Sequence, residues 1–311
     1  RPAYSEWLDA LEDHLERDEN ASTWQAMWLE LVQLKSCDPV RAAAFLRNLF
    51  VKYPSVRDSR FGVRIIAETR TYLGENVFSE TCDHMGDSGW TMGKQAKGEL
   101  LGLSYLASDG FQSVDEFVEG AIASKSTVDS QILKGIAFVA ANLWKDTHCR
   151  ARSTFVFERL VERECPQINE ALMEGVLFDK FVPNQHSKRI LKAMDKFPAV
   201  IQGVDAYSVA EMLEEFVISD PFSVVRLSNA LLDQLLSEED NGHRRNYDLS
   251  DAAMTSVAMT LQRMEGQLRA DGLDLFERLL TMGFSATAQT IRAIDNRPIH
   301  VPPRVRRRRR R

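Results

Sequence analysis

Apolar residues recur at three- and four-residue spacing along most of this chain, and that helical periodicity constrains the fold more than any other feature of the sequence. Ser, Asp or Asn residues stand where several of the periodic segments begin, which is where helices take their N-caps. Runs of β-branched residues that alternate with polar ones over the length of a strand are nearly absent. The sequence therefore predicts an all-α fold.

Four segments carry recognisable helix starts. "SEWLDALEDHL" and "STWQAMWLELVQL" each open on a serine, while "CDPVRAAAFLRNLFVKY" and "SDPFSVVRLSNALLDQLL" each open on Asp-Pro. Aspartate suits the cap position, and proline suits the first helical position because its missing N–H has no intrahelical partner there. The predicted caps are Ser5, Ser22, Asp38 and Asp220.

The remaining periodic segments predict a series of paired helices. Pair starts are spaced by roughly 31 to 44 residues, close to the period of about 40 of HEAT and armadillo repeats. We therefore expect a HEAT/armadillo-like α-solenoid of about seven helix pairs over residues 1–296, and since no residue signature recurs, an irregular helical bundle is the alternative. These helices are expected near residues 58–72, 77–84, 90–107, 113–123, 127–146, 150–164, 167–180, 187–196, 206–218, 222–237, 249–267, 272–282 and 285–294.

Residues 297–311 form a segment of different composition, rich in proline and arginine, which we expect to be a disordered tail. The formal net charge is −6, but without the tail arginines 32 basic side chains face 45 acidic ones, a net charge of −13. Such an acidic body argues against nucleic-acid binding by the main surface, so only the tail offers a dense basic patch. The candidate residues for binding nucleic acid or an acidic partner are Arg304, Arg306, Arg307, Arg308, Arg309, Arg310 and Arg311. A localisation or membrane-surface patch, and an arginine run without function, are the other interpretations.

The four cysteines have no CxxC spacing, which favours free thiols in a cytoplasmic protein. Cys82 with His84, and His148 with Cys149, place soft metal ligands close together, but adjacent helical residues face different directions. No metal or cofactor site is predicted. The longest apolar stretch, residues 135–144, is about half the length needed to cross a bilayer, so we expect no membrane insertion.

Signatures of common enzymes are missing. "GDSGW", residues 86–90, carries the letters that surround the nucleophile of trypsin-like proteases, but it lies between predicted helices, where Ser88 is better explained as a helix cap. "GWTMGKQ" lacks the first glycine and the hydroxyl residue of a phosphate loop. An unfamiliar helical active site would require His84 or His186 to lie beside buried carboxylates. No catalytic residue is predicted.

Two stretches, "GKQAKGELLGLSYLAS" (Gly93 to Ser108) and "GLDLFERLLTMGFSATAQTIRAID" (Gly272 to Asp295), resemble the helical C-terminal regions of large bacterial ATP-binding proteins, which include the STAND NTPases of anti-phage defence. The resemblance extends over most of residues 20–296. It implies a sensor or scaffold arm whose nucleotide-binding and effector domains lie upstream of Arg1, and the start at Arg1 in place of Met agrees with a fragment.

From these features we expect a non-enzymatic helical-repeat scaffold or sensor arm that binds a protein partner along one helical ridge. The alternative is a nucleic-acid-binding helical-repeat protein that uses its arginine tail for affinity. An enzyme with an unfamiliar active site is a third hypothesis.

Overall fold

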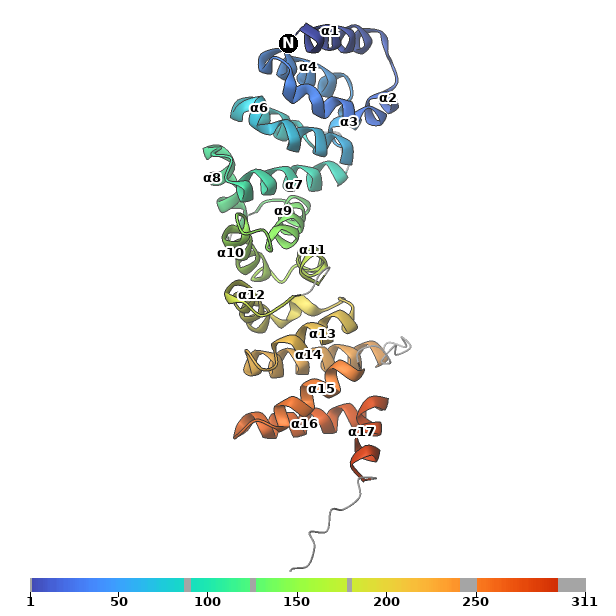
Figure 1. Cartoon of the computed structure of the whole chain (residues 1–311), viewed down its shortest axis with the longest axis vertical. Coiled ribbons are helices and arrows are strands. Elements are labelled where there is room, and N and C mark those ends of the chain that lie inside the picture. The colour runs from blue at the N-terminus through green and yellow to red at the C-terminus, as the bar shows by residue number, and fades with distance from the viewer. Residues whose placement is uncertain (1, 87–90, 124–126, 178–180, 241–250, 296–311) are drawn as a thin grey trace, which may run out of the picture. The chain divides into compact units, whose positions relative to one another are not determined.

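The computed structural model describes residues 2–86, 91–123, 127–177, 181–240 and 251–295. Within these ranges every regular element is a helix and there is no β-strand, which confirms the all-α prediction (Figure 1). The chain divides into two compact units, residues 1–205 and 206–311. Among the described helices, none combines the length and the apolar character that a bilayer-crossing segment needs.

The first unit holds the larger share of the helices. Its elements are α1 (Pro2–Arg17), α2 (Ala21–Ala26), α3 (Trp28–Leu31), the 3-10 helix η1 (Val32–Ser36), α4 (Pro39–Lys52), α5 (Pro54–Arg57), α6 (Arg60–His84), α7 (Thr91–Ala107), α8 (Gln112–Ile122), α9 (Ser130–Leu143), α10 (Arg150–Val161), α11 (Pro166–Leu177), α12 (Gln185–Lys196) and the 3-10 helix η2 (Pro198–Ile201). The second unit holds α13 (Ala206–Phe216), α14 (Pro221–Asp240), α15 (Asp251–Gln262), α16 (Gln267–Thr281) and α17 (Ser285–Asp295).

Two of the predicted caps are wrong. Ser5 lies inside α1, which begins at Pro2, because proline is already suited to a first helical turn. Asn20 caps α2 in place of Ser22: its side-chain oxygen accepts a hydrogen bond from the Ser22 backbone N–H at 3.0 Å. The single helix expected from Ser22 onward is also broken at Met27, where φ and ψ are −85° and 13°, into α2, α3 and η1.

Other local predictions are confirmed. The Asp38 carboxylate accepts a hydrogen bond from the Arg41 backbone N–H at 2.9 Å, with proline in the first turn of α4. The predicted separation of residues 58–72 from 77–84 corresponds to a kink in α6 at Gly74, whose φ of 70° favours glycine. The helix expected at residues 222–237 extends further, because α14 continues to Asp240.

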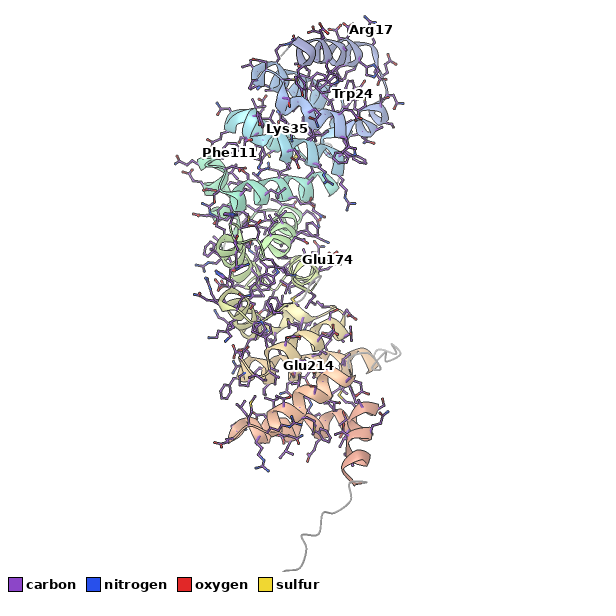
Figure 2. All side chains as sticks on the ribbon, in the orientation of Figure 1. Arg17, Trp24, Lys35, Phe111, Glu174 and Glu214 are labelled. Carbon is purple, nitrogen blue, oxygen red and sulfur yellow. The ribbon has the colours of Figure 1, made fainter. Side chains whose placement is uncertain are left out.

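Helices that are two apart in the chain lie side by side in both units (Figure 1). In the first unit α7 packs along α9 and α9 along α11, while α10 packs along α12 and also contacts α8 and α9. In the second unit α15 packs against α13 and α17, and α16 against α14. The side chain of Trp24, fully buried among the N-terminal helices (Figure 2), lies with ring centroids 5.2 Å from His14 and 5.8 Å from Phe45.

Glycines bring the backbones of α7, α9 and α11 unusually close. A Cβ atom on Gly98 would lie 2.0 Å from the Ile132 carbonyl oxygen, and one on Gly135 would lie 2.2 Å from the Gln95 carbonyl oxygen. A Cβ atom on Gly175 would lie 2.5 Å from the Cβ atom of Ala141. These distances are far below van der Waals contact, so the packing of the three helices requires glycine.

Polar side chains join neighbouring helices at several sequence separations, such as 31 residues for Arg189 and Glu158 and 49 residues for Arg278 and Asn229. Lys94 contacts Asp129 at 2.7 Å and Lys134 contacts Glu170 at 3.1 Å, pairs that are 35 and 36 residues apart. In the second unit the hydroxyls of Thr255 and Thr287, 32 residues apart, lie within 2.7 Å. The separations of these last three pairs fall within the predicted period of 31 to 44 residues, whereas that of Arg278 and Asn229 falls outside it.

We predict that Gly98→Ala destabilises the first unit, because the new methyl group would overlap the Ile132 carbonyl and push α7 from α9. The free energy of unfolding should fall by about 1–3 kcal/mol, as expected for overpacking, measured by urea unfolding followed by circular dichroism.

The matched control is Gly120→Ala in α8, where an added Cβ would meet nothing within 4 Å. Alanine there should raise the free energy of unfolding by about 0.5–1 kcal/mol through helix propensity. Equal effects of the two substitutions would contradict the close approach of α7 and α9.

Candidate functional site

Some of the residues singled out in the sequence lie outside the described residues. They include the tail arginines, Arg304 and Arg306 to Arg311, and Ser88 of "GDSGW". The remaining candidates are placed by the structure.

The two cysteine–histidine pairs do not come together. Cys82 is buried while His84 is exposed, and Cys149 is buried while His148 is exposed, as the different directions of neighbouring side chains predicted. No group of three or more His, Cys, Asp or Glu side chains among the described residues is placed to hold a metal ion.

His186 and the buried carboxylates are also separate. The Nδ1 atom of half-buried His186 lies 3.4 Å from the Thr154 hydroxyl, and no carboxylate of the described residues contacts this imidazole. The buried Asp58 accepts from the Arg57 guanidinium at 2.7 Å. The buried Asp251 accepts from the Ser285 hydroxyl at 2.8 Å and from the next backbone N–H at 2.7 Å, and so holds the start of α17. Both carboxylates therefore have structural partners.

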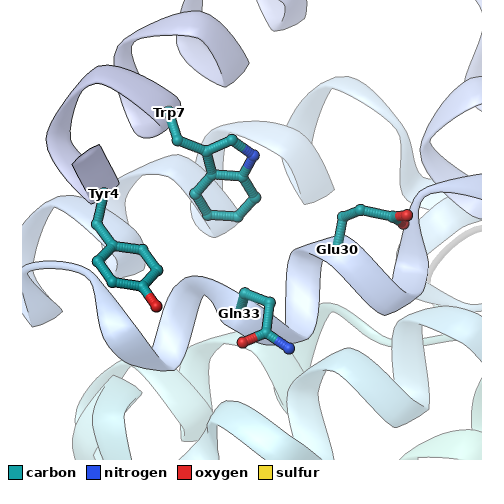
Figure 3. Close-up of a pocket in the computed structure, with 4 residues that line it drawn as sticks. All are labelled: Tyr4, Trp7, Glu30 and Gln33. Atoms are coloured by element: carbon teal, nitrogen blue, oxygen red, sulfur yellow. The ribbon is translucent and has the colours of Figure 1, made fainter.

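One pocket lies at the N-terminal helices, with a volume of about 300 Å³. Tyr4 and Trp7 of α1 form one side of it, and Glu30 of α3 and Gln33 of η1 form the other (Figure 3). Two aromatic rings beside two polar side chains can hold an apolar side chain of a partner. The pocket has no group placed for catalysis.

A second cavity, of about 320 Å³, is the groove between α10 and α12. Its aromatic side chains are Phe155 of α10 and Phe197, which follows α12 directly. Its exposed cations are Arg159, Arg189, Lys192 and Lys196. The Arg159 guanidinium lies 5.4 Å from the centroid of the Phe155 ring, and the Lys196 ammonium lies 4.8 Å from that of Phe197. We call this surface the α10–α12 groove.

A bidentate ion pair crosses the α10–α12 groove. Arg189 donates from Nε to Glu158 at 2.8 Å and from Nη2 at 2.5 Å, and this carboxylate raises the pKa of the guanidinium. Glu162 lines the groove as well. Arg159, Lys192 and Lys196 form no ion pair with any carboxylate of the described residues. The groove therefore offers three cations that have no ion-pair partner among the described residues, beside two aromatic rings.

A third cavity, of about 450 Å³, lies in the second unit between α14 and α16. Asp274 and Glu277 line it together with Arg278, whose guanidinium donates to Asp233 at 2.7 Å. The lining of this cavity is acidic, and its cation, Arg278, already has an ion-pair partner.

Sequence reasoning missed the α10–α12 groove. The available signal was "SKRILKAMDK" of α12, in which Lys188, Lys192 and Lys196 recur every four residues. Such spacing places the three ammonium groups on one stripe of a helix. The acidic net charge of the body obscured this local basic stripe.

No family model, curated protein or solved structure matches the chain.

We predict that Cys82 resists alkylation in the folded protein. Burial raises the pKa of this thiol to about 12, so at pH 8 only about one thiol in ten thousand is a thiolate. Iodoacetamide labelling followed by peptide mass spectrometry should modify the half-buried Cys165 and spare Cys82. Denaturant should abolish the difference, and equal labelling of both in the native protein would contradict the placement of Cys82.

Proposed function

We propose that this chain is a non-enzymatic, HEAT-like helical-repeat scaffold that binds a protein partner. The side-by-side packing of alternate helices and the polar contacts at separations of 32 to 36 residues support the repeat architecture. Helical repeats present long ridges and grooves to other macromolecules, and this is their usual role.

The observation that carries the proposal is the α10–α12 groove. Hot spots of protein interfaces are enriched in aromatic residues and arginine, and charged residues that lack partners within one protein are available to another. The groove combines both features in one open cavity. In addition, the Tyr4–Trp7 pocket offers an apolar receptor on the same unit (Figure 3).

The resemblance of residues 93–108 and 272–295 to bacterial ATP-binding proteins supports a wider proposal. On this proposal the scaffold is the recognition arm of a larger, cytoplasmic, ATP-dependent protein of anti-phage defence, and nucleotide chemistry belongs to other domains. The partner would then be the molecule that such an arm detects.

A second candidate function, nucleic-acid binding by the arginine tail, is favoured by the seven tail arginines of residues 304–311. It predicts a slope of log affinity against log salt concentration of about −5 to −6, because each neutralised phosphate releases counterions. The measurement is fluorescence anisotropy with a labelled duplex, comparing the full chain with a chain whose seven arginines are serines. An unchanged slope would exclude the tail as the binding element.

The scaffold proposal predicts protein cross-links from the α10–α12 groove. A photoreactive amino acid placed at Ala193, which lines the groove, should capture discrete proteins in cells of the source organism when the full chain is used. The control position is Glu174, which projects from α11 on the other side of the unit from α10 and α12 (Figure 2) and is exposed. The proposal fails if position 193 captures no protein, or if position 174 captures the same set.

A further inference from the structure

We infer that the α10–α12 groove binds a short acidic peptide segment of the partner, whose carboxylates pair with Arg159, Lys192 and Lys196. This inference rests on the proposed scaffold function and names the chemistry of its partner. It follows from the charges in the groove, the packing of α12 and the length of the cavity.

The cations of the groove differ from several cations that form ion pairs between neighbouring helices of this unit. Arg47 pairs with Glu80 at 2.7 Å, Lys94 with Asp129 at 2.7 Å, and Lys134 with Glu170 at 3.1 Å. By contrast Arg159, Lys192 and Lys196 have no carboxylate within ion-pair distance among the described residues. Because Glu158 pairs with Arg189, only Glu162 is left beside these three cations, and the groove keeps a net positive charge.

The lysines of α12 have no role in holding the helix in place. Ile190, Leu191 and Met194 are buried and pack α12 into the unit. Lys188, Lys192 and Lys196 recur every four residues, and like charges at this spacing destabilise a helix. None of them forms an ion pair within the described residues. An external anion would relieve this repulsion.

The aromatic side chains of the groove indicate that the ligand also has an apolar part. Phe155 and Phe197 are half-buried, and each ring already has a cation near its centroid. An apolar side chain placed between two carboxylates can contact the rings while its neighbours meet the cations. A peptide with acidic residues around an apolar one fits both parts of the groove.

The groove favours a peptide over nucleic acid. Because Glu158 and Glu162 in the cavity repel carboxylates and phosphates alike, the distinction between the two ligands rests on their length. The part of α12 that lines the cavity runs from Arg189 to Lys196, about 12 Å of helix, which matches about four residues of extended peptide. A nucleic-acid strand would run beyond the groove onto a chain that is otherwise acidic, with a net charge of −13 outside the tail.

The test measures binding to the full chain in which the seven tail arginines are serines, so that the tail cannot bind the probe. The probe is a fluorescein-labelled peptide of seven residues with four glutamates around a central leucine, followed by fluorescence anisotropy. The same peptide with glutamines in place of glutamates should bind at least about tenfold more weakly, since only charge distinguishes them.

Two matched variants locate the binding. Lys192→Glu with Lys196→Glu should weaken the affinity for the acidic peptide at least about tenfold. The control, Lys35→Glu with Arg263→Glu, makes the same change in net charge at exposed positions outside the groove, and should weaken it less than about twofold. Lys35 lies on η1, far along the chain from the groove (Figure 2). The substituted side chains are exposed, and melting curves verify folding. Lys192→Gln with Lys196→Gln repeats the test without reversing charge.

Several outcomes would overturn the inference. They are equal binding of both peptides, equal loss in the groove and control variants, or tighter groove-dependent binding of a fifteen-nucleotide deoxythymidine oligomer. A groove cross-link to a protein whose contact segment is not acidic would also overturn it, while leaving the scaffold function standing. Conversely, acidic-peptide binding without any protein cross-link would contradict the scaffold function alone.

Discussion

The close approach of α7, α9 and α11 at glycine is the contact on which the rest of the first unit depends. Gly98 and Gly135 bring the backbones of α7 and α9 so near that no side chain fits between them, and Gly175 does the same for α11 against Ala141. Contact over so short a distance leaves little freedom for the three helices to shift. Because α10 packs against α9, α11 and α12, the position of the α10–α12 groove is determined by this glycine-packed layer.

Many carboxylates in both units hold helices in place. For this reason the described residues contain no cluster of acidic and basic side chains suited to proton transfer. Asp38 and Asp251 hold helix starts, Asp58 pairs with Arg57, and Glu80 and Glu170 hold the adjacent helix through a cation. Each of these carboxylates therefore already has a structural partner. The charged groups without such a partner include Arg159, Lys192 and Lys196 of the α10–α12 groove.

Helix existence could be predicted from the sequence because apolar periodicity and Asp-Pro starts are local signals. The caps of α1 and α2 could not be predicted, and Ser5 and Ser22 were wrong. Which of several neighbouring residues caps a helix depends on how the preceding chain enters the helix. Asn20 and Ser22 are only two residues apart, and both residue types suit a cap. The groove depends on which faces of α10 and α12 meet. Glu158 and Arg189 are 31 residues apart, and nothing in either segment alone indicates that they pair.

The chain as a whole is acidic, whereas the α10–α12 groove is locally basic. This contrast affects which ligand the groove selects. At physiological ionic strength charges separated by more than about 8 Å are largely screened, so a short anion within the groove experiences chiefly its cations. A longer polyanion extends beyond the groove onto a chain whose net charge outside the tail is −13. The bidentate pair of Arg189 with Glu158 sharpens this selection, since it neutralises one cation that would otherwise attract any anion. Selection for a short acidic segment therefore arises from where the body is acidic as much as from where the groove is basic.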